Sequence, residues 1–143
     1  MRLAVLWAVL LGTTACGSEA SPLGFGAQVA VSGLTQAEVS SLEGFVFEPR
    51  LSNGDTILTC LSLVANDVNP RGNDVVTIAS ALASVNQNAE VVLEFGAVPE
   101  GEDLLVYVEA FDPAATLNGR GCVEGVTVAG GESNRVDLVV EGL

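Results

Sequence analysis

The chain of 143 residues contains no histidine, and its basic residues are five arginines with no lysine. Without histidine there is no Ser–His triad and no imidazole general base, and without lysine there is no Schiff base. The lack of histidine also argues against zinc and copper sites. Eighteen acidic residues give a formal net charge of −13. Such a surface repels nucleic acid and anionic lipid, so we expect no nucleic-acid partner.

Aromatic residues are also scarce, with one Trp, one Tyr and five Phe. Trp7 lies in the apolar run near the N-terminus. Tyr107 and Phe111 share one side of the strand that we expect over residues 104–111. We predict that these two rings are core residues and do not form a platform for carbohydrate.

Residues 1–16 have the layout of a secretory signal. Arg2 precedes an apolar run over residues 3–11, and the small residues 12–15 lead to Cys16. Because a bilayer span needs about 20 apolar residues, we expect this segment to be cleaved and not to cross the membrane.

The sequence Thr14-Ala15-Cys16 resembles the lipobox of bacterial lipoproteins. The resemblance implies that Cys16 is lipidated and becomes the mature N-terminus. Gly17, in place of Asp, resembles the signal for sorting to the outer membrane. The alternative is ordinary secretion, with cleavage after Ala15 or Ala20.

If Cys16 carries lipid, Cys60 and Cys122 remain as an even pair in an oxidising compartment. We therefore predict a disulfide between them; the alternative is two buried free thiols. Removal of residues 1–15 leaves one ordinary domain's length and a formal charge of −14. The expected organisation is a signal peptide over 1–15, a lipidated N-terminus and flexible tether over 16–26, and a β domain over 27–143.

Short apolar runs separated by turn residues follow the tether, and no long helical pattern appears. Strands are predicted over residues 28–31, 42–48, 75–78, 91–95, 104–111, 122–128 and 135–140. Residues 56–64 are apolar on both sides, which slightly favours a buried strand over a short helix, and the alanine-rich residues 79–85 read as helical or irregular. Pro49 should end the second strand, and the last strand should pair in the interior of a sheet. Seven or eight short strands predict an all-β fold, a single antiparallel β-sandwich.

One hairpin carries a second resemblance. The sequence FGAVPEG at residues 95–101, followed by the strand at 104–111 and Asp112, resembles a hairpin of transthyretin-like and carboxypeptidase-regulatory-like bacterial β-sandwiches. The strand at 122–128 and the turn at Gly130-Gly131 extend it. The resemblance implies the fold of an accessory, structural or interaction module.

Carboxylates are the remaining candidates for catalysis. Glu100, Glu102 and Asp103 cluster in a turn, while Glu109 and Asp112 flank a strand end. A glycosidase needs two carboxylates at a set separation in a cleft, and acidic turn residues are normally solvated. We therefore predict no catalytic residue, no enzymatic activity and no cofactor.

Calcium is the one metal that the oxygen ligands allow. Residues 67–72 partly match the EF-hand pattern, but Arg71 occupies a ligand position and Ile78 stands where the bidentate Glu is required. We reject an EF-hand and assign no metal ligand. An irregular site at Asp67 and Asp74, or at the turn acids, stays open.

Together these patterns predict a non-enzymatic cell-envelope lipoprotein that acts as a structural or protein-interaction module. The lipid on Cys16 would hold it to a membrane, and an envelope protein would be its partner. The alternative is a secreted module that binds a small ligand or carbohydrate, with or without calcium.

Overall fold

The computed structural model describes residues 24–35, 38–86, 91–130 and 134–143. The expected signal segment, Cys16 and residues 17–23 of the expected tether lie outside these ranges. The elements are β1 (Phe25–Ser32), β2 (Ser41–Leu51), α1 (Cys60–Val64), β3 (Val75–Ser84), β4 (Val91–Glu94), β5 (Gly101–Phe111), β6 (Leu117–Val128) and β7 (Asn134–Gly142). β1 thus begins inside the segment expected to be tether. The described residues contain no helix with the length and hydrophobicity of a transmembrane span.

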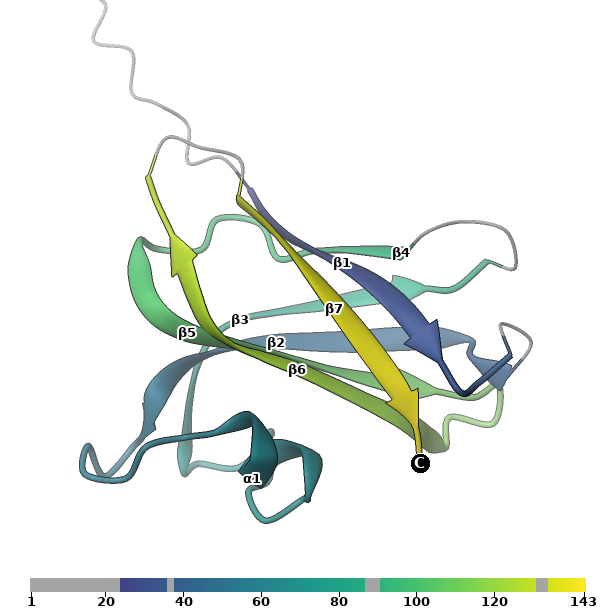
Figure 1. The fold of residues 1–143 in the computed structure, drawn as a ribbon, viewed down its shortest axis with the longest axis horizontal. Coiled ribbons are helices and arrows are strands. Elements are labelled where there is room, and N and C mark those ends of the chain that lie inside the picture. The colour runs from purple at the N-terminus through teal and green to yellow at the C-terminus, as the bar shows by residue number, and fades with distance from the viewer. Residues whose placement is uncertain (1–23, 36–37, 87–90, 131–133) are drawn as a thin grey trace, which may run out of the picture.

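The strands form one seven-stranded sheet in the order β3-β2-β5-β6-β7-β1-β4. Neighbouring strands are antiparallel except β1 and β7, which run parallel from Phe25 opposite Asn134 to Ser32 opposite Glu141. The edge strands β3 and β4 also contact each other, and the sheet curls into a nearly closed barrel (Figure 1). The prediction of an all-β fold is confirmed, whereas the prediction of a clearly antiparallel sandwich is wrong. The interior place predicted for the last strand is confirmed, since β7 lies between β6 and β1.

The main core lies inside the curled sheet. Alternation along the strands turns one set of side chains inward, as expected for period-2 patterns. β5 provides Leu104, Val106, Val108 and Ala110 to this core. Its other side is also buried, because residues 52–74 cover the outer face of β2 and β5. A second cluster forms there from Phe45, Phe47, Leu58, Leu63, Val75, Leu105 and Tyr107.

The covering segment contains α1, at residues where the sequence pattern slightly favours a strand. Thr59 caps α1: its side chain accepts a hydrogen bond from Ser62 N, and the Ser62 side chain accepts one from Thr59 N. This reciprocal capping box starts a helical turn, which the two-sided apolar pattern could not distinguish from a strand. The expected strand over 56–64 is therefore wrong, and the short-helix alternative is correct.

Two further local predictions are corrected. Residues 79–84 belong to β3, because they pair with residues 41–46 of β2 and their alanines pack on the main core. Tertiary pairing overrides the helix propensity of alanine here. β2 continues through Pro49 to Leu51, because the β2–β3 register shifts between Phe47 and Leu51, and a proline is tolerated at such an irregularity.

Candidate functional site

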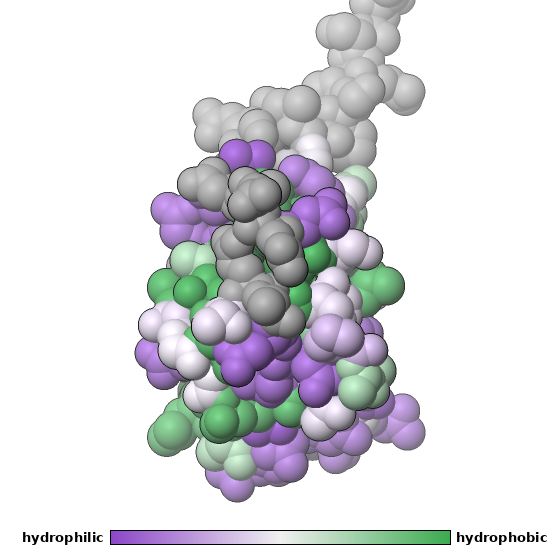
Figure 2. All heavy atoms as spheres, turned by 90° about the vertical axis from the view of Figure 1, so that its right-hand side faces the viewer, coloured by the Kyte–Doolittle hydropathy of each residue, from purple (hydrophilic) through white to green (hydrophobic). Residues whose placement is uncertain are grey.

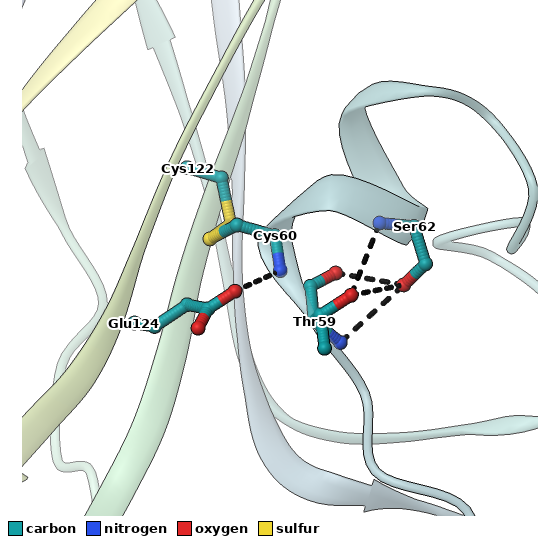
Figure 3. Close-up of a disulfide and its surroundings, with 5 residues drawn as sticks. All are labelled: Thr59, Cys60, Ser62, Cys122 and Glu124. Carbon is teal, nitrogen blue, oxygen red and sulfur yellow. Dashed lines mark hydrogen bonds between the residues drawn. A yellow bond between two sulfur atoms is a disulfide. The ribbon is translucent and has the colours of Figure 1, made fainter.

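The segment over residues 52–74, which we call the cover, is fixed to β6 by a disulfide. The structure joins Cys60 at the start of α1 to Cys122 of β6, with a Cα–Cα distance of 5.5 Å. This is the pairing expected from the sequence. Glu124, two residues further along β6, accepts a hydrogen bond from the backbone N–H of Cys60 (Figure 3). The carboxylate thus satisfies a backbone donor in the first turn of α1.

Arg120 of β6 holds the other end of α1. Its Nη1 donates to the carbonyl of Val64 at 3.2 Å, and its Nη2 donates to Oδ1 of Asn66 at 3.3 Å. A cation at the last helical carbonyls satisfies acceptors that the helix leaves unpaired. The cover is therefore attached to the sheet at both ends of its helix.

Beneath the cover, β5 carries a buried carboxylate. Glu109 is 3% exposed and is the buried charged residue among those described. Tyr107, which is fully buried, donates a hydrogen bond from its hydroxyl to Oε1 of Glu109 at 2.9 Å. Burial first, and then the negative charge and hydrogen bond of Glu109, raise the pKa of Tyr107 well above its ordinary value. Tyr107 is therefore a neutral donor at physiological pH.

Arg71 of the cover neutralises this carboxylate. Its Nη2 lies 2.7 Å from Oε2 of Glu109 and also donates to Oε2 of Glu43 on β2. Partial burial lowers the pKa of Arg71, but its interactions with the Glu43 and Glu109 carboxylates outweigh burial and raise it above its usual value. The Arg71 side chain keeps 44% exposure, so solvent screens the pairs.

The Arg71 guanidinium also lies against two aromatic rings. Its central carbon is 5.2 Å from the centroid of the Phe45 ring and 6.0 Å from that of the Phe111 ring. Guanidinium groups favour such positions because a ring face attracts a cation. The site therefore consists of two carboxylates, two aromatic rings and the arginine that they hold.

The other candidate carboxylates do not join this site. Glu100, Glu102 and Asp103 are exposed, and Asp103 adopts a φ of 58° at the irregular start of β5. Asp112 accepts hydrogen bonds from Ala114 N and Thr116 N in the turn between β5 and β6. Solvation of the turn acids agrees with expectation, whereas the burial of Glu109 was not anticipated.

The structure does bring Asp67 and Asp74 to one shallow pocket of about 400 Å³, with Asn53 and Asn69 in its wall. Among the described residues, however, no group of three or more acidic, cysteine or histidine side chains lies close enough to hold a metal. Two carboxylates and two amides carry little charge for a calcium site, whose affinity depends on the number of charged ligands.

An apolar groove opens at one end of the barrel, beside β1 and β7. It has a volume of about 580 Å³ and carries polar groups at Gln28 and Asp137. Its apolar wall consists of Val29, Val31, Leu34, Val85, Val91 and Val139. Figure 2 shows that hydrophobic side chains are interspersed with hydrophilic ones on the face at the right of Figure 1. That face is therefore not uniformly acidic.

Sequence reasoning missed the pairing of Arg71 with Glu109. The available signal was β5 itself, where Tyr107 and Glu109 stand on the same side as the apolar Leu105. A tyrosine and a glutamate in a strand that is apolar on both faces point to a buried polar pair, because buried charges need partners. The arginine that completes the pair lies 38 residues away, and no local pattern connects the two.

Comparison with protein-family models, curated proteins and solved structures found no match. The resemblances to lipoproteins and to transthyretin-like domains therefore stay predictions.

Proposed function

We propose that the protein is a cell-envelope lipoprotein whose β domain is a non-enzymatic protein-interaction module. The observation that carries this proposal is the edge of β3, which contacts β4 but is not hydrogen-bonded to it. The strand has ten residues, and none of them is charged. It pairs with β2 on one side only, and the described residues provide no strand that is hydrogen-bonded to its other side.

Edge strands of soluble proteins are usually protected by charged residues, prolines, bulges or short length. The other edge strand, β4, follows this rule, because it has four residues and ends at Glu94. β3 has a register shift between Thr77 and Ala79 but no charged residue and no proline, and its Leu82 is 76% exposed. An uncharged edge of this length favours the addition of an extended strand from a partner, in which main-chain hydrogen bonds provide affinity.

The polar site supports a role other than catalysis. A general acid or base needs a titratable group in contact with substrate. Glu109 is instead buried beneath the cover, where Tyr107 and Arg71 occupy its two oxygens. The exposed acids are scattered over turns and strands, so we propose no catalytic residue.

The anchor is tested by labelling cells with a palmitate analogue and fractionating them. We expect label on the wild type and on Ser18→Ala, and none on Cys16→Ser, which should also leave the membrane fraction. Membrane association of Cys16→Ser would refute the lipid anchor, and the protein would then be a secreted domain or be held by another contact.

The interaction edge is tested by photo-crosslinking in intact cells. A crosslinker at Leu82 should give a defined product with one envelope protein, whereas one at Val139, which is 52% exposed on an interior strand, should not. Ser80→Lys on β3 should abolish that product, while Thr127→Lys on β6 should leave it unchanged. Equal products from both crosslinker positions would refute the proposal that a partner binds at the β3 edge.

The groove supports a second candidate, a module for a small apolar ligand, because its volume and lining resemble those of ligand pockets. Carbohydrate is less well supported, since the described residues contain no exposed aromatic ring. Saturable binding of the neutral dye Nile red that is lost in Val31→Asp would favour this candidate over the first.

A further inference from the structure

The surroundings of Arg71 have the composition of a receptor for a guanidinium group. Glu43 and Glu109 stand directly opposite each other on β2 and β5. Phe45 lies two residues along β2 from Glu43, and Phe111 lies two residues along β5 from Glu109. Two carboxylates and two ring faces match a planar cation that forms ion pairs and also stacks. An ammonium group would use the charges but would gain less from the rings.

The receptor is built on the sheet and does not depend on Arg71 for its position. Glu109 is 3% exposed, and Tyr107 holds its Oε1 at 2.9 Å. Among the described residues nothing hydrogen-bonds Oε2 of Glu109, and its contact with Arg71 at 2.7 Å is an ion pair outside good hydrogen-bond geometry. Without a cation, a buried carboxylate oxygen would face a second carboxylate, which is unfavourable. The empty receptor would therefore favour uptake of a cation.

Arg71 itself comes from a loop and not from the sheet. It follows Asn69, whose Oδ1 accepts from the Arg71 backbone N–H at 3.0 Å and whose carbonyl accepts from Gly72 N at 2.9 Å. This turn lies beyond α1, which the disulfide and Arg120 attach to β6. Arg71 can thus leave the receptor while α1 stays in place.

We propose that Glu43, Glu109, Phe45 and Phe111 form a binding site for an arginine side chain presented by a partner protein, and that Arg71 occupies it in the free protein. That the arginine belongs to a partner rests on the interaction function proposed above; the affinity of the site for guanidinium does not. A protein this acidic attracts a basic partner over a distance.

Arg71 determines the concentration at which another guanidinium group can displace it from the receptor. A side chain on a short loop acts at an effective concentration in the millimolar range. Free guanidinium compounds should therefore displace it only at higher concentrations. A partner arginine that makes further contacts, for example along β3, would compete at far lower concentrations.

The test is chemical rescue in the full chain. Arg71→Ala should lower the melting temperature, and methylguanidinium at concentration c should raise it again in proportion to ln(1 + c/Kd), by about 5 °C at ten times the dissociation constant. Wild type should not respond at the same ionic strength. Arg135→Ala is the matched control, because its exposed pair with Glu94 spans 3.9 Å and forms no such receptor. Addition of Glu109→Gln to Arg71→Ala should abolish the rescue.

Peptides then identify the ligand class. The peptide acetyl-Gly-Arg-Gly-amide should bind Arg71→Ala at least about tenfold more tightly than the lysine or citrulline analogue. If Arg71→Ala does not fold, Arg71→Met replaces it, and methylguanidinium should restore folding of either variant.

A folded Arg71→Ala protein whose melting temperature does not rise with methylguanidinium concentration, an equal rise in Arg135→Ala, or unfolded variants that methylguanidinium leaves unfolded would each overturn the proposal. None of these results depends on a partner. Failure of the guanidinium site is therefore distinguishable from failure of the crosslink at β3, which tests the interaction function alone.

Discussion

Removal of the Cys60–Cys122 disulfide should destabilise the domain strongly. The bond joins residues that are 62 apart in sequence. In the chain-entropy description, closing such a loop restricts the unfolded chain and stabilises the fold by about 4 kcal/mol. With an unfolding entropy of about 2.1 cal/mol/K per residue over roughly 120 residues, this loss corresponds to a fall in melting temperature of roughly 15 °C.

The variant Cys60→Ala/Cys122→Ala, compared with wild type by urea unfolding and circular dichroism, measures this loss. The native fold should persist, because Leu58 and Leu63 still bury the cover against the sheet. Each single variant, kept reduced, should lose about as much as the double variant, since either change removes the same bond. A loss below about 1 kcal/mol, or single losses that add up to the double, would refute the reasoning.

Three further predictions concern the polar site and the acidic pocket. Glu109→Ala should lower the free energy of unfolding by about 2–3 kcal/mol, because the Tyr107 hydroxyl loses its acceptor. Glu109→Gln keeps an acceptor and should cost at least about 1 kcal/mol less. Equal losses for the two variants, measured by urea unfolding, would contradict this. The pKa of Tyr107 is raised in the folded state, so the stability that it contributes is complete below its unfolded pKa of about 10 and is lost as pH rises further. Tyrosinate absorbance of this single tyrosine should therefore appear only well above pH 10, and Tyr107→Phe should weaken the alkaline loss of stability; a normal titration would contradict the burial. Calcium should raise the melting temperature no more than magnesium at equal ionic strength, because among the described residues the pocket gathers two carboxylates, Asp67 and Asp74. A calcium-specific rise that is lost in Asp74→Asn would show a real site.

Local patterns were sufficient for most of the strands. A few neighbouring residues determine the apolar–polar alternation in β5 and β7 and the turns between strands. The predictions for these two strands therefore agree with the structure. The predictions for residues 56–64 and 79–85 are wrong for a physical reason. A capping box starts α1 in the first segment, and pairing with β2 makes residues 79–84 of the second a strand, whereas composition alone favours the opposite in each.

The arrangement of the strands and the composition of the polar site could not be predicted from short stretches of sequence, for a different reason. Which strands pair, and that β1 runs parallel to β7, depends on how the whole sheet curls. The guanidinium site likewise joins Glu43, Arg71 and Glu109 from three separate segments. These residues lie close together only because of the fold, and nothing in the sequence near any one of them indicates the other two.

The parallel pairing of β1 with β7 also constrains the order of assembly. The first strand of the domain hydrogen-bonds along eight registered positions with the last one, residues 134–141. In the export proposed above, the N-terminal strand would cross the membrane first, and the sheet could not close until the C-terminal residues had followed. Contacts this distant in sequence slow folding. The chain is thus expected to remain unfolded until its synthesis is nearly complete, which is the state that the proposed export requires.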